Sequence, residues 1–326
     1  MTLGASASVT DPGRRRRRNE DSYVCEPPLF AIADGMGGAQ AGEVASRLAA
    51  AALQEANGDE LTEERLVELI QEANRRVFKR ASEDAATSGM GTTMTVALVG
   101  EKSIVFAHVG DSRAYRVRDG ELEQLTDDHS LVGELLRSGR LSAEEAEVHP
   151  QRSVITRAVG TEPDVDVDTF TIPALPGDLF LLCSDGLTDM ISDREIFSVL
   201  EGEDDLDAVA RALVAAANAG GGEDNITVVL FQIAPPGEPG EETVRLPAAA
   251  VVEPETEPEL EDTLSGLEGV PAVDTAVVSA DDVREHIRRE EANADPSPRG
   301  RRVLPLLLLV LLLAVVVALV VWGLYR

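Results

Sequence analysis

The sequence predicts an α+β domain of layered architecture, followed by a linker and one transmembrane helix. Strand-like apolar runs follow one another along the first 235 residues, and helical patterns stand in separate blocks. This order favours antiparallel sheets over the alternating strand–helix units of a Rossmann fold. A run of twenty uncharged residues near the C-terminus supplies the transmembrane helix. The chain has 326 residues, 44% hydrophobic and only 3% aromatic, so its core is sizeable and mostly aliphatic.

The expected elements follow from hydrophobic spacing. The helix expected over 62–85 places its apolar residues on one face at the helical repeat. Asp119-Gly120 is typical of a two-residue hairpin turn between strands. A helical flap is expected over 131–165, with a break at Gly139 and a second short helix from Ser142. The other expectations are strands at 29–33, 93–99, 103–109, 114–118, 121–126, 179–183 and 226–233, and helices at 43–56 and 206–218.

Composition divides the chain into three parts. Residues 1–235 form the folded domain. Residues 236–298 carry 17 Asp and Glu against 4 Arg, with eight prolines and no aromatic residue. Such a segment buries too little apolar surface to fold, so we interpret it as a disordered linker with one short helix at 279–291. Residues 299–326 form a basic flank and the membrane segment.

The segment 303–322 is long enough to cross a bilayer once, because twenty helical residues span about 30 Å. Three arginines precede it, and Trp322 closes it. Positive charge on the N-terminal flank predicts a single-pass protein of the cell membrane with its N-terminal domain in the cytoplasm. The alternative is a buried helix of a soluble core, but nothing around the segment could cover it.

Charge and cysteine content exclude two classes of protein. The formal charge is −30, whereas nucleic-acid binding depends on Lys and Arg that neutralise phosphates. The two cysteines exclude the disulfide framework of small secreted proteins. Residues 1–13 lack the apolar run of a secretory signal.

Four aspartates lie at expected strand ends or in tight turns: Asp34, Asp111, Asp185 and Asp224. Glycines beside three of them let the backbone approach a ligand and present a carbonyl oxygen. Several carboxylates that converge with carbonyls form a hard site suited to Mg²⁺ or Mn²⁺, and the sequence has no His/Cys cluster for zinc or iron. Each Asp-Gly alone is more typical of a plain turn, and it is the set of four sites together with Asn19-Glu20-Asp21 that indicates a metal site.

These motifs, in this order, resemble those of the metal-dependent Ser/Thr protein phosphatases of type 2C. The resemblance extends through most of residues 8–234, and its pattern is that of the bacterial, membrane-anchored branch that opposes Ser/Thr kinases. The motifs are Arg16 with Asn19-Glu20-Asp21, Asp34-Gly35-Met36-Gly37-Gly38, Gly91-Thr92-Thr93, Gly110-Asp111-Ser112-Arg113, Cys183-Ser184-Asp185-Gly186 and Glu223-Asp224-Asn225.

The resemblance implies an α-β-β-α sandwich of two antiparallel sheets flanked by helices, with two Mn²⁺ or Mg²⁺ ions at one edge. In the family pattern Asp34 bridges both metals, the Gly35 carbonyl binds the second, and Glu20 lies in its water shell. The first metal is bound by Asp185 and Asp224. A third, weaker metal is held by Asp111 and Asp185, with Ser153 of the flap in contact.

The implied reaction is the hydrolysis of phosphoserine and phosphothreonine in proteins by in-line attack of a hydroxide bridging the two ions. Arg16, four residues before Glu20, is the expected phosphate-binding guanidinium, because a bidentate fork suits phosphate. For the neighbouring arginines of 14–18 a solvated basic patch or an alternating strand is the expectation. Met36 stands where eukaryotic relatives have a histidine, so the general acid is open. His129 is conceivable as that acid, but a structural role is favoured for His129, His108 and Cys183.

The expected partners are phosphorylated Ser/Thr proteins, among them transmembrane Ser/Thr kinases, and the membrane itself. Two alternatives of another class remain open. One is a catalytically inactive, membrane-tethered scaffold that binds phosphoproteins. The other is an adaptor that acts through its acidic linker.

Overall fold

The computed structural model describes residues 2–37, 41–55, 62–147, 149–234 and 276–277. The chain divides into two compact units, Met1–Ser279 and Ala280–Arg326. The second unit lies outside the described residues, as do the segments expected to form a short helix and a transmembrane helix. None of the helices that the structure does describe is long and apolar enough to cross a membrane. The predicted domain boundary at residue 235 and the predicted linker therefore stay predictions.

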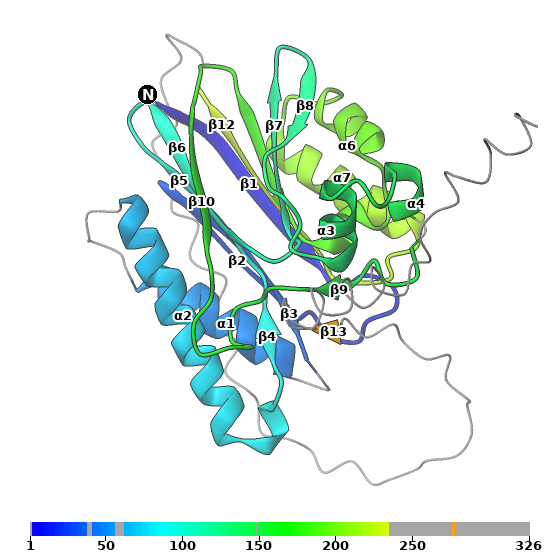
Figure 1. Ribbon diagram of the computed structural model, residues 1–326. Helices are drawn as coiled ribbons and strands as arrows, with labels where there is room; N and C mark the ends of the chain where they lie inside the picture. The colour runs from blue at the N-terminus through cyan, green and yellow to red at the C-terminus, as the bar shows by residue number, and fades with distance from the viewer. Residues whose placement is uncertain (1, 38–40, 56–61, 148, 235–275, 278–326) are drawn as a thin grey trace, which may run out of the picture. The chain divides into compact units, whose positions relative to one another are not determined.

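Two antiparallel sheets form the centre of the first unit (Figure 1). One sheet has the order β1-β12-β11-β7-β8 and the other the order β10-β6-β5-β3-β2, with β4 paired to β3. The strands of the first sheet are β1 (Leu3–Asp11), β12 (Ile226–Ile233), β11 (Leu179–Cys183), β7 (Arg113–Arg118) and β8 (Glu121–Gln124). Those of the second are β10 (Asp168–Pro173), β6 (Ser103–Val109), β5 (Met94–Val99), β3 (Leu29–Met36), β2 (Asp21–Glu26) and β4 (Gly91–Thr92).

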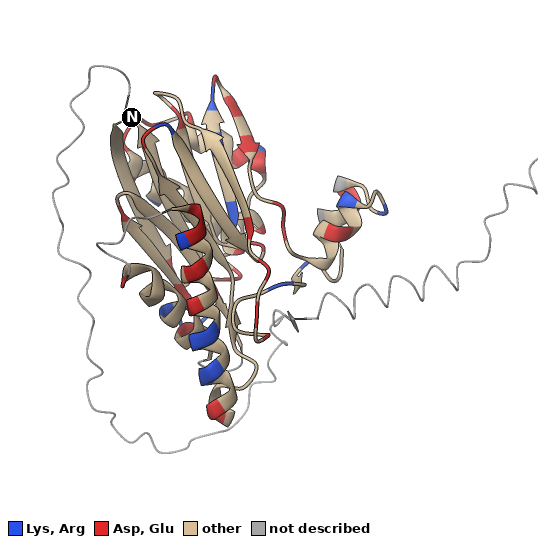
Figure 2. Ribbon diagram, turned by 60° about the vertical axis from the view of Figure 1, so that its left-hand side comes forward, with Lys and Arg blue, Asp and Glu red and all other residues tan. Residues whose placement is uncertain are grey.

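Helices cover the outer face of each sheet. The helices α1 (Ala41–Gln54) and α2 (Glu63–Glu83) pack on the second sheet. The helices α5 (Asp185–Thr188), α6 (Asp193–Leu200) and α7 (Leu206–Gly220) pack on the first. The ribbon colours of Figure 2 show acidic and basic residues interspersed along α2, and the apolar face of this helix is buried. The layers are helix, sheet, sheet and helix, which confirms the predicted sandwich.

Strand alternation builds the layers. In β3, Phe30 and Ile32 belong to the core between the sheets, whereas Ala31 and Ala33 face the helices. The ring of Phe231 from the opposite sheet stacks on Phe30 at a centroid distance of 4.3 Å. The few aromatic residues are thus concentrated where the two sheets meet.

Most predicted elements are confirmed. The strands expected at 103–109, 179–183 and 226–233 begin and end as predicted. The backbone φ angles of Asp119 and Gly120 are both positive, at 53° and 75°, as the hairpin prediction requires. Among the described elements of six or more residues, four were not expected: β1, β2, β10 and α6. The alternative of a strand over 14–18 is wrong, because this stretch forms turns and bends.

The flap consists of two short helices and a short strand. They are α3 (Leu131–Arg137), α4 (Ala143–Glu147) and β9 (Val154–Ile155). Ser130 caps α3 by accepting a hydrogen bond from the Gly133 amide, and Gly139, with a φ of 69°, lies in the break between the helices. The expected flap architecture is confirmed. The strand β9 pairs in parallel with β13 (Ala276–Val277).

Candidate metal centre

Five aspartates gather at the shared end of the two sheets. The second sheet contributes two of them, because Asp21 on β2 pairs directly across from Asp34 on β3. The first sheet contributes Asp185, directly after Ser184 at the end of β11, and Asp224, two residues before β12. Asp111 lies in the turn that leads from β6 in one sheet to β7 in the other. The two sheets therefore meet around a group of carboxylates.

Two glycines let the backbone close around this group. A Cβ atom at Gly35 would lie 2.2 Å from the Gly42 carbonyl oxygen and 2.5 Å from that of Glu20. A Cβ atom at Gly186 would lie 2.0 Å from the carbonyl oxygen of Asn225. Only glycine fits such close approaches. The Asp-Gly pairs of the sequence thus serve the packing of the site rather than plain turns.

The carboxylates raise one another's pKa. Removal from water is the largest cause for Asp34 and Asp185, whose pKa values lie well above their usual range, and neighbouring carboxylates are the next cause. Burial likewise raises the pKa of Asp21 to about 6 and that of Asp111 to about 7. A divalent cation would relieve this repulsion and so favour the charged forms.

Three of these carboxylates have an oxygen with no hydrogen-bond partner. Oδ1 of Asp21, Asp111 and Asp185 is buried and unpaired, whereas buried polar atoms are nearly always paired. Carboxylate and backbone oxygens are the donors that Mg²⁺ and Mn²⁺ prefer, so these residues fit a divalent cation. Within the described part of the chain no three acidic, histidine or cysteine side chains already converge on one point in coordination geometry. Carboxylates of like charge repel one another and separate when no cation lies between them, so the unpaired oxygens indicate the candidate site.

Arg16 lies at the edge of the carboxylate group. Its Nη2 donates to Asp224 Oδ2 at 2.6 Å, and its side chain is 27% exposed. Arg15 instead pairs with Glu223 outside the group, and its side chain is 65% exposed. Burial raises the pKa of Glu20, and the charge of nearby Arg16 lowers it in part. The structure thus separates Arg16 from the other arginines of this stretch.

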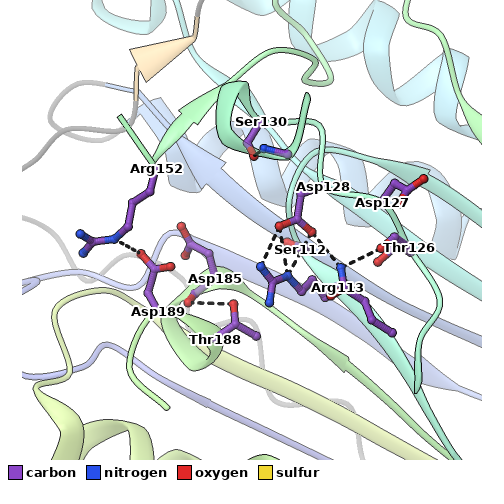
Figure 3. Close-up of polar contacts among 12 residues, drawn as sticks. Ser112, Arg113, Thr126, Asp127, Asp128, Ser130, Arg152, Asp185, Thr188 and Asp189 are labelled. Atoms are coloured by element: carbon purple, nitrogen blue, oxygen red, sulfur yellow. Dashed lines mark hydrogen bonds and ion pairs between the residues drawn. The ribbon is translucent and has the colours of Figure 1, made fainter. Parts of the chain in front are cut away.

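A second carboxylate set lies under the flap (Figure 3). Asp185 and Asp189 lie side by side on the first turns after β11, and Arg152 of the flap approaches Asp189 with Nε at 3.4 Å from Oδ2. The negative charge of nearby Asp111 helps to raise the pKa of Asp185. Ser153 follows Arg152 and is half-buried. Asp111 and Asp185 are therefore near each other, and the roles of Asp111, Asp185 and Ser153 as ligands of a third metal stay predictions.

Three other residues have structural environments. His108 is 1% exposed and bonds to Thr95 and to the Asp127 carbonyl. His129 is 3% exposed, and burial lowers its pKa to about 3, which argues against a proton donor at neutral pH. Cys183 is fully buried, and burial raises the pKa of its thiol to about 12. The expectation of structural roles is supported for all three.

Sequence reasoning missed two members of the site. Asp21 was part of a quoted motif but not of the expected ligand set. Its Oδ2 accepts hydrogen bonds from Thr227 and Ser184, which aims the carboxylate at Asp34. Asp189 was not singled out, although its spacing of four from Asp185 in a helical turn is a usable signal.

The fold and this centre define a class of protein that uses carboxylate-held divalent cations on an anionic substrate. Comparison with known proteins identifies the family. The family model described as Protein phosphatase 2C matches residues 17–220. The chain therefore belongs to the protein phosphatase 2C family of metal-dependent serine/threonine phosphatases.

Similar proteins include characterised bacterial phosphatases. The serine/threonine phosphatase stp of Listeria innocua is 42% identical over 235 residues, which cover 68% of this chain and 93% of that protein. The serine/threonine protein phosphatase PstP of Mycobacterium tuberculosis is 41% identical over 230 residues, which cover 70% of this chain and 44% of PstP.

Solved structures give the same result. The crystal structure of Mycobacterium tuberculosis PstP/Ppp matches with a TM-score of 0.69 and 40% identity, covering 72% of this chain and all of that one. The PstP catalytic domain in complex with two manganese ions matches with a TM-score of 0.67 and 37% identity, again covering 72% of this chain and all of that one.

Proposed function

We propose that this chain is a membrane-anchored protein serine/threonine phosphatase that uses two Mn²⁺ or Mg²⁺ ions and reverses Ser/Thr kinase signalling in the cytoplasm. The catalytic part of the proposal rests on the cluster of aspartates at the shared end of the two sheets, three of which have a buried, unpaired oxygen. Arg16 lies at the edge of this cluster and bonds to Asp224. The manganese ions in the PstP catalytic domain support the choice of metal.

The residues of the chain divide the work. In the proposed site Asp34 would hold both ions, Asp185 and Asp224 would hold one of them, and the Gly35 carbonyl would hold the other. When bound, such an ion pair activates water and neutralises charge on the phosphoryl group. Arg16 presents its guanidinium at the rim, where a bidentate fork can orient the phosphate oxygens.

The catalytic part is tested by hydrolysis of phosphoserine and phosphothreonine peptides by the full chain. We expect activity with Mn²⁺ or Mg²⁺ and loss of activity in excess EDTA. Full activity in EDTA would contradict the metal mechanism. Binding of phosphopeptides without hydrolysis in Mn²⁺ would instead favour the inactive scaffold.

The anchoring part rests on the uncharged segment 303–322, which lies outside the described residues. A coil of 63 residues (236–298) has a root-mean-square reach of about 45 Å, so the domain would act close to the membrane, at raised effective concentration towards membrane-bound kinases. Deletion of 303–326 tests this. We expect membrane substrates to become more phosphorylated in cells, with unchanged hydrolysis of peptides in vitro. An identical response of membrane and soluble substrates at matched protein levels would refute tethering.

A further inference from the structure

The buried ring of His129 links two parts of the active site that are separate in the sequence. One is the turn that carries Asp111, between β6 and β7. The other is the base of the flap, at residues 155–157. One ring nitrogen of His129 bonds to the turn, and the other bonds to the carboxylate of Asp168, which contacts the base of the flap.

On the side of the turn, His129 makes two hydrogen bonds with Gly110, the residue before Asp111. The Gly110 amide donates to Nδ1 at 3.0 Å, and the His129 amide donates to the Gly110 carbonyl at 2.7 Å. The backbone that precedes the Asp111 carboxylate is therefore fixed on both its polar groups.

On the side of the flap, the Thr156 amide donates to the His129 carbonyl at 2.8 Å. The ring Nε2 bonds to Asp168 Oδ2 at 3.1 Å. The other oxygen of Asp168 accepts from Arg157 of the flap base. Asp168 is itself placed by the β10–β6 pairing, which sets it opposite His108.

These bonds define one state of the ring. Because Nδ1 accepts from an amide, the hydrogen of neutral His129 is on Nε2, where it donates to Asp168. His129 is 3% exposed, and the ring of His108 lies against it at a centroid distance of 4.7 Å. His129 is therefore bonded to both the turn and the flap base, where Arg157 Nη1 also lies 3.2 Å from Nε2.

We propose that His129 is a positioning residue that couples the flap, through Asp168 and Arg157, to the Asp111 carboxylate. The coupling of flap and turn stands on geometry alone. Its consequence for the weakest metal site rests on the proposed function.

Two substitutions of His129 separate its two nitrogens. His129→Asn keeps an acceptor near the Nδ1 position and loses the bond to Asp168. His129→Gln keeps a donor near the Nε2 position and loses the acceptor for the Gly110 amide. Asp168→Ala removes the carboxylate that bonds to both His129 and Arg157 without changing His129 itself. The matched control is Asp166→Ala, which removes an exposed carboxylate two residues away.

Hydrogen exchange of the metal-free full chain in EDTA tests the coupling without reference to activity. We expect the Gly110 amide to exchange about fivefold faster or more in His129→Gln than in His129→Asn, since one hydrogen bond is lost. In Asp168→Ala we expect faster exchange at both Thr156 and Gly110, and in Asp166→Ala at neither. Asp168→Ala alters a half-exposed side chain, so it decides the matter if the His129 variants do not fold.

Titration of the full chain with Mn²⁺ alone tests the consequence. We expect His129→Gln to weaken the affinity for the last Mn²⁺ to bind by about 3- to 10-fold and to leave the affinities for the earlier ions unchanged. We expect His129→Asn, which keeps the acceptor for the Gly110 amide, to show only a small part of this loss. Unchanged exchange at Gly110 in Asp168→Ala, or equal losses in the two His129 variants, would overturn the proposal. Altered exchange with unchanged Mn²⁺ binding would overturn its consequence for the metal, while the proposed phosphatase activity would be unaffected.

Discussion

Replacement of Asp111 by asparagine should stabilise the metal-free protein at pH 8. Asp111 is 8% exposed, one of its oxygens is unpaired, and its folded-state pKa is about 7 against 3.8 in an unfolded chain. At ~1.4 kcal/mol for each tenfold change in proton affinity, ionisation of Asp111 opposes folding at pH 8 by at most about 4 kcal/mol. A neutral amide removes that cost, but its unpaired NH₂ group takes back about 1–2 kcal/mol. We therefore expect a net gain of about 1–3 kcal/mol.

The effect has a defined pH dependence. A carboxyl whose folded-state pKa is raised is neutral in both states below 3.8, so it does not oppose folding there. Its cost to folding grows as the pH rises above 3.8 and reaches its full value above about 7, where the folded-state carboxyl is also ionised. Urea unfolding in EDTA, followed by circular dichroism, should show the gain of Asp111→Asn at pH 8 and little at pH 4.5, with Asp166→Asn as the exposed control. A lower urea midpoint for Asp111→Asn at pH 8, or the same gain at both pH values, would refute the reasoning.

Three further outcomes are expected. Asp34→Asn should lower the rate of p-nitrophenyl phosphate hydrolysis in Mn²⁺ by about 10³-fold or more with the fold intact by circular dichroism, because in the proposed site this carboxylate would hold both ions; retention of a tenth of the rate would contradict this role. Arg16→Ala should lower kcat/KM for phosphopeptides far more than Arg15→Ala, since only Arg16 lies against the carboxylate group; equal losses would argue against a single phosphate-binding guanidinium. Phe231→Ala should lower the free energy of unfolding in urea by about 3–5 kcal/mol, whereas Leu175→Ala, 49% exposed, should change it by less than about 0.5 kcal/mol; similar values would mean that the core between the sheets does not dominate stability.

The accuracy of the sequence predictions follows the burial of each element. The strands β11 and β12 are buried on both faces, so they read as continuous apolar runs with clear ends. In contrast, β1 is built mostly from small or polar residues, and β10 is an edge strand with half-exposed positions. Neither pattern stands out from a loop without its neighbours. The helix α6 could have been predicted from the sequence, because Ser192 and Glu195 have the spacing of a capping box, and they form one in the structure.

For the site, local motifs predict the residue types but not their partners. The aspartates next to glycine were identified because several of them recur at the ends of apolar strands, whereas a single Asp-Gly would fit a plain turn. Asp21 was missed as a site member because its role depends on the register of β2 against β3, which places it opposite Asp34. The role of His129 likewise depends on β10 pairing with β6 and on the return of the flap. Such information is carried by pairing across long sequence separations.

The arrangement also explains why a metal centre and this sandwich suit each other. The middle of the sandwich is joined by stacked aromatic rings, with Phe231 between Phe30 and Phe180. At the shared end the same two sheets bring together carboxylates that repel one another. Because Asp34 belongs to one sheet and Asp185 follows the other, a cation held by both would join the layers at an end where the carboxylate charges oppose their contact. Binding of metal and closure of this end of the fold are then one equilibrium, so any substitution that changes the carboxylate charge alters stability and metal affinity in opposite directions.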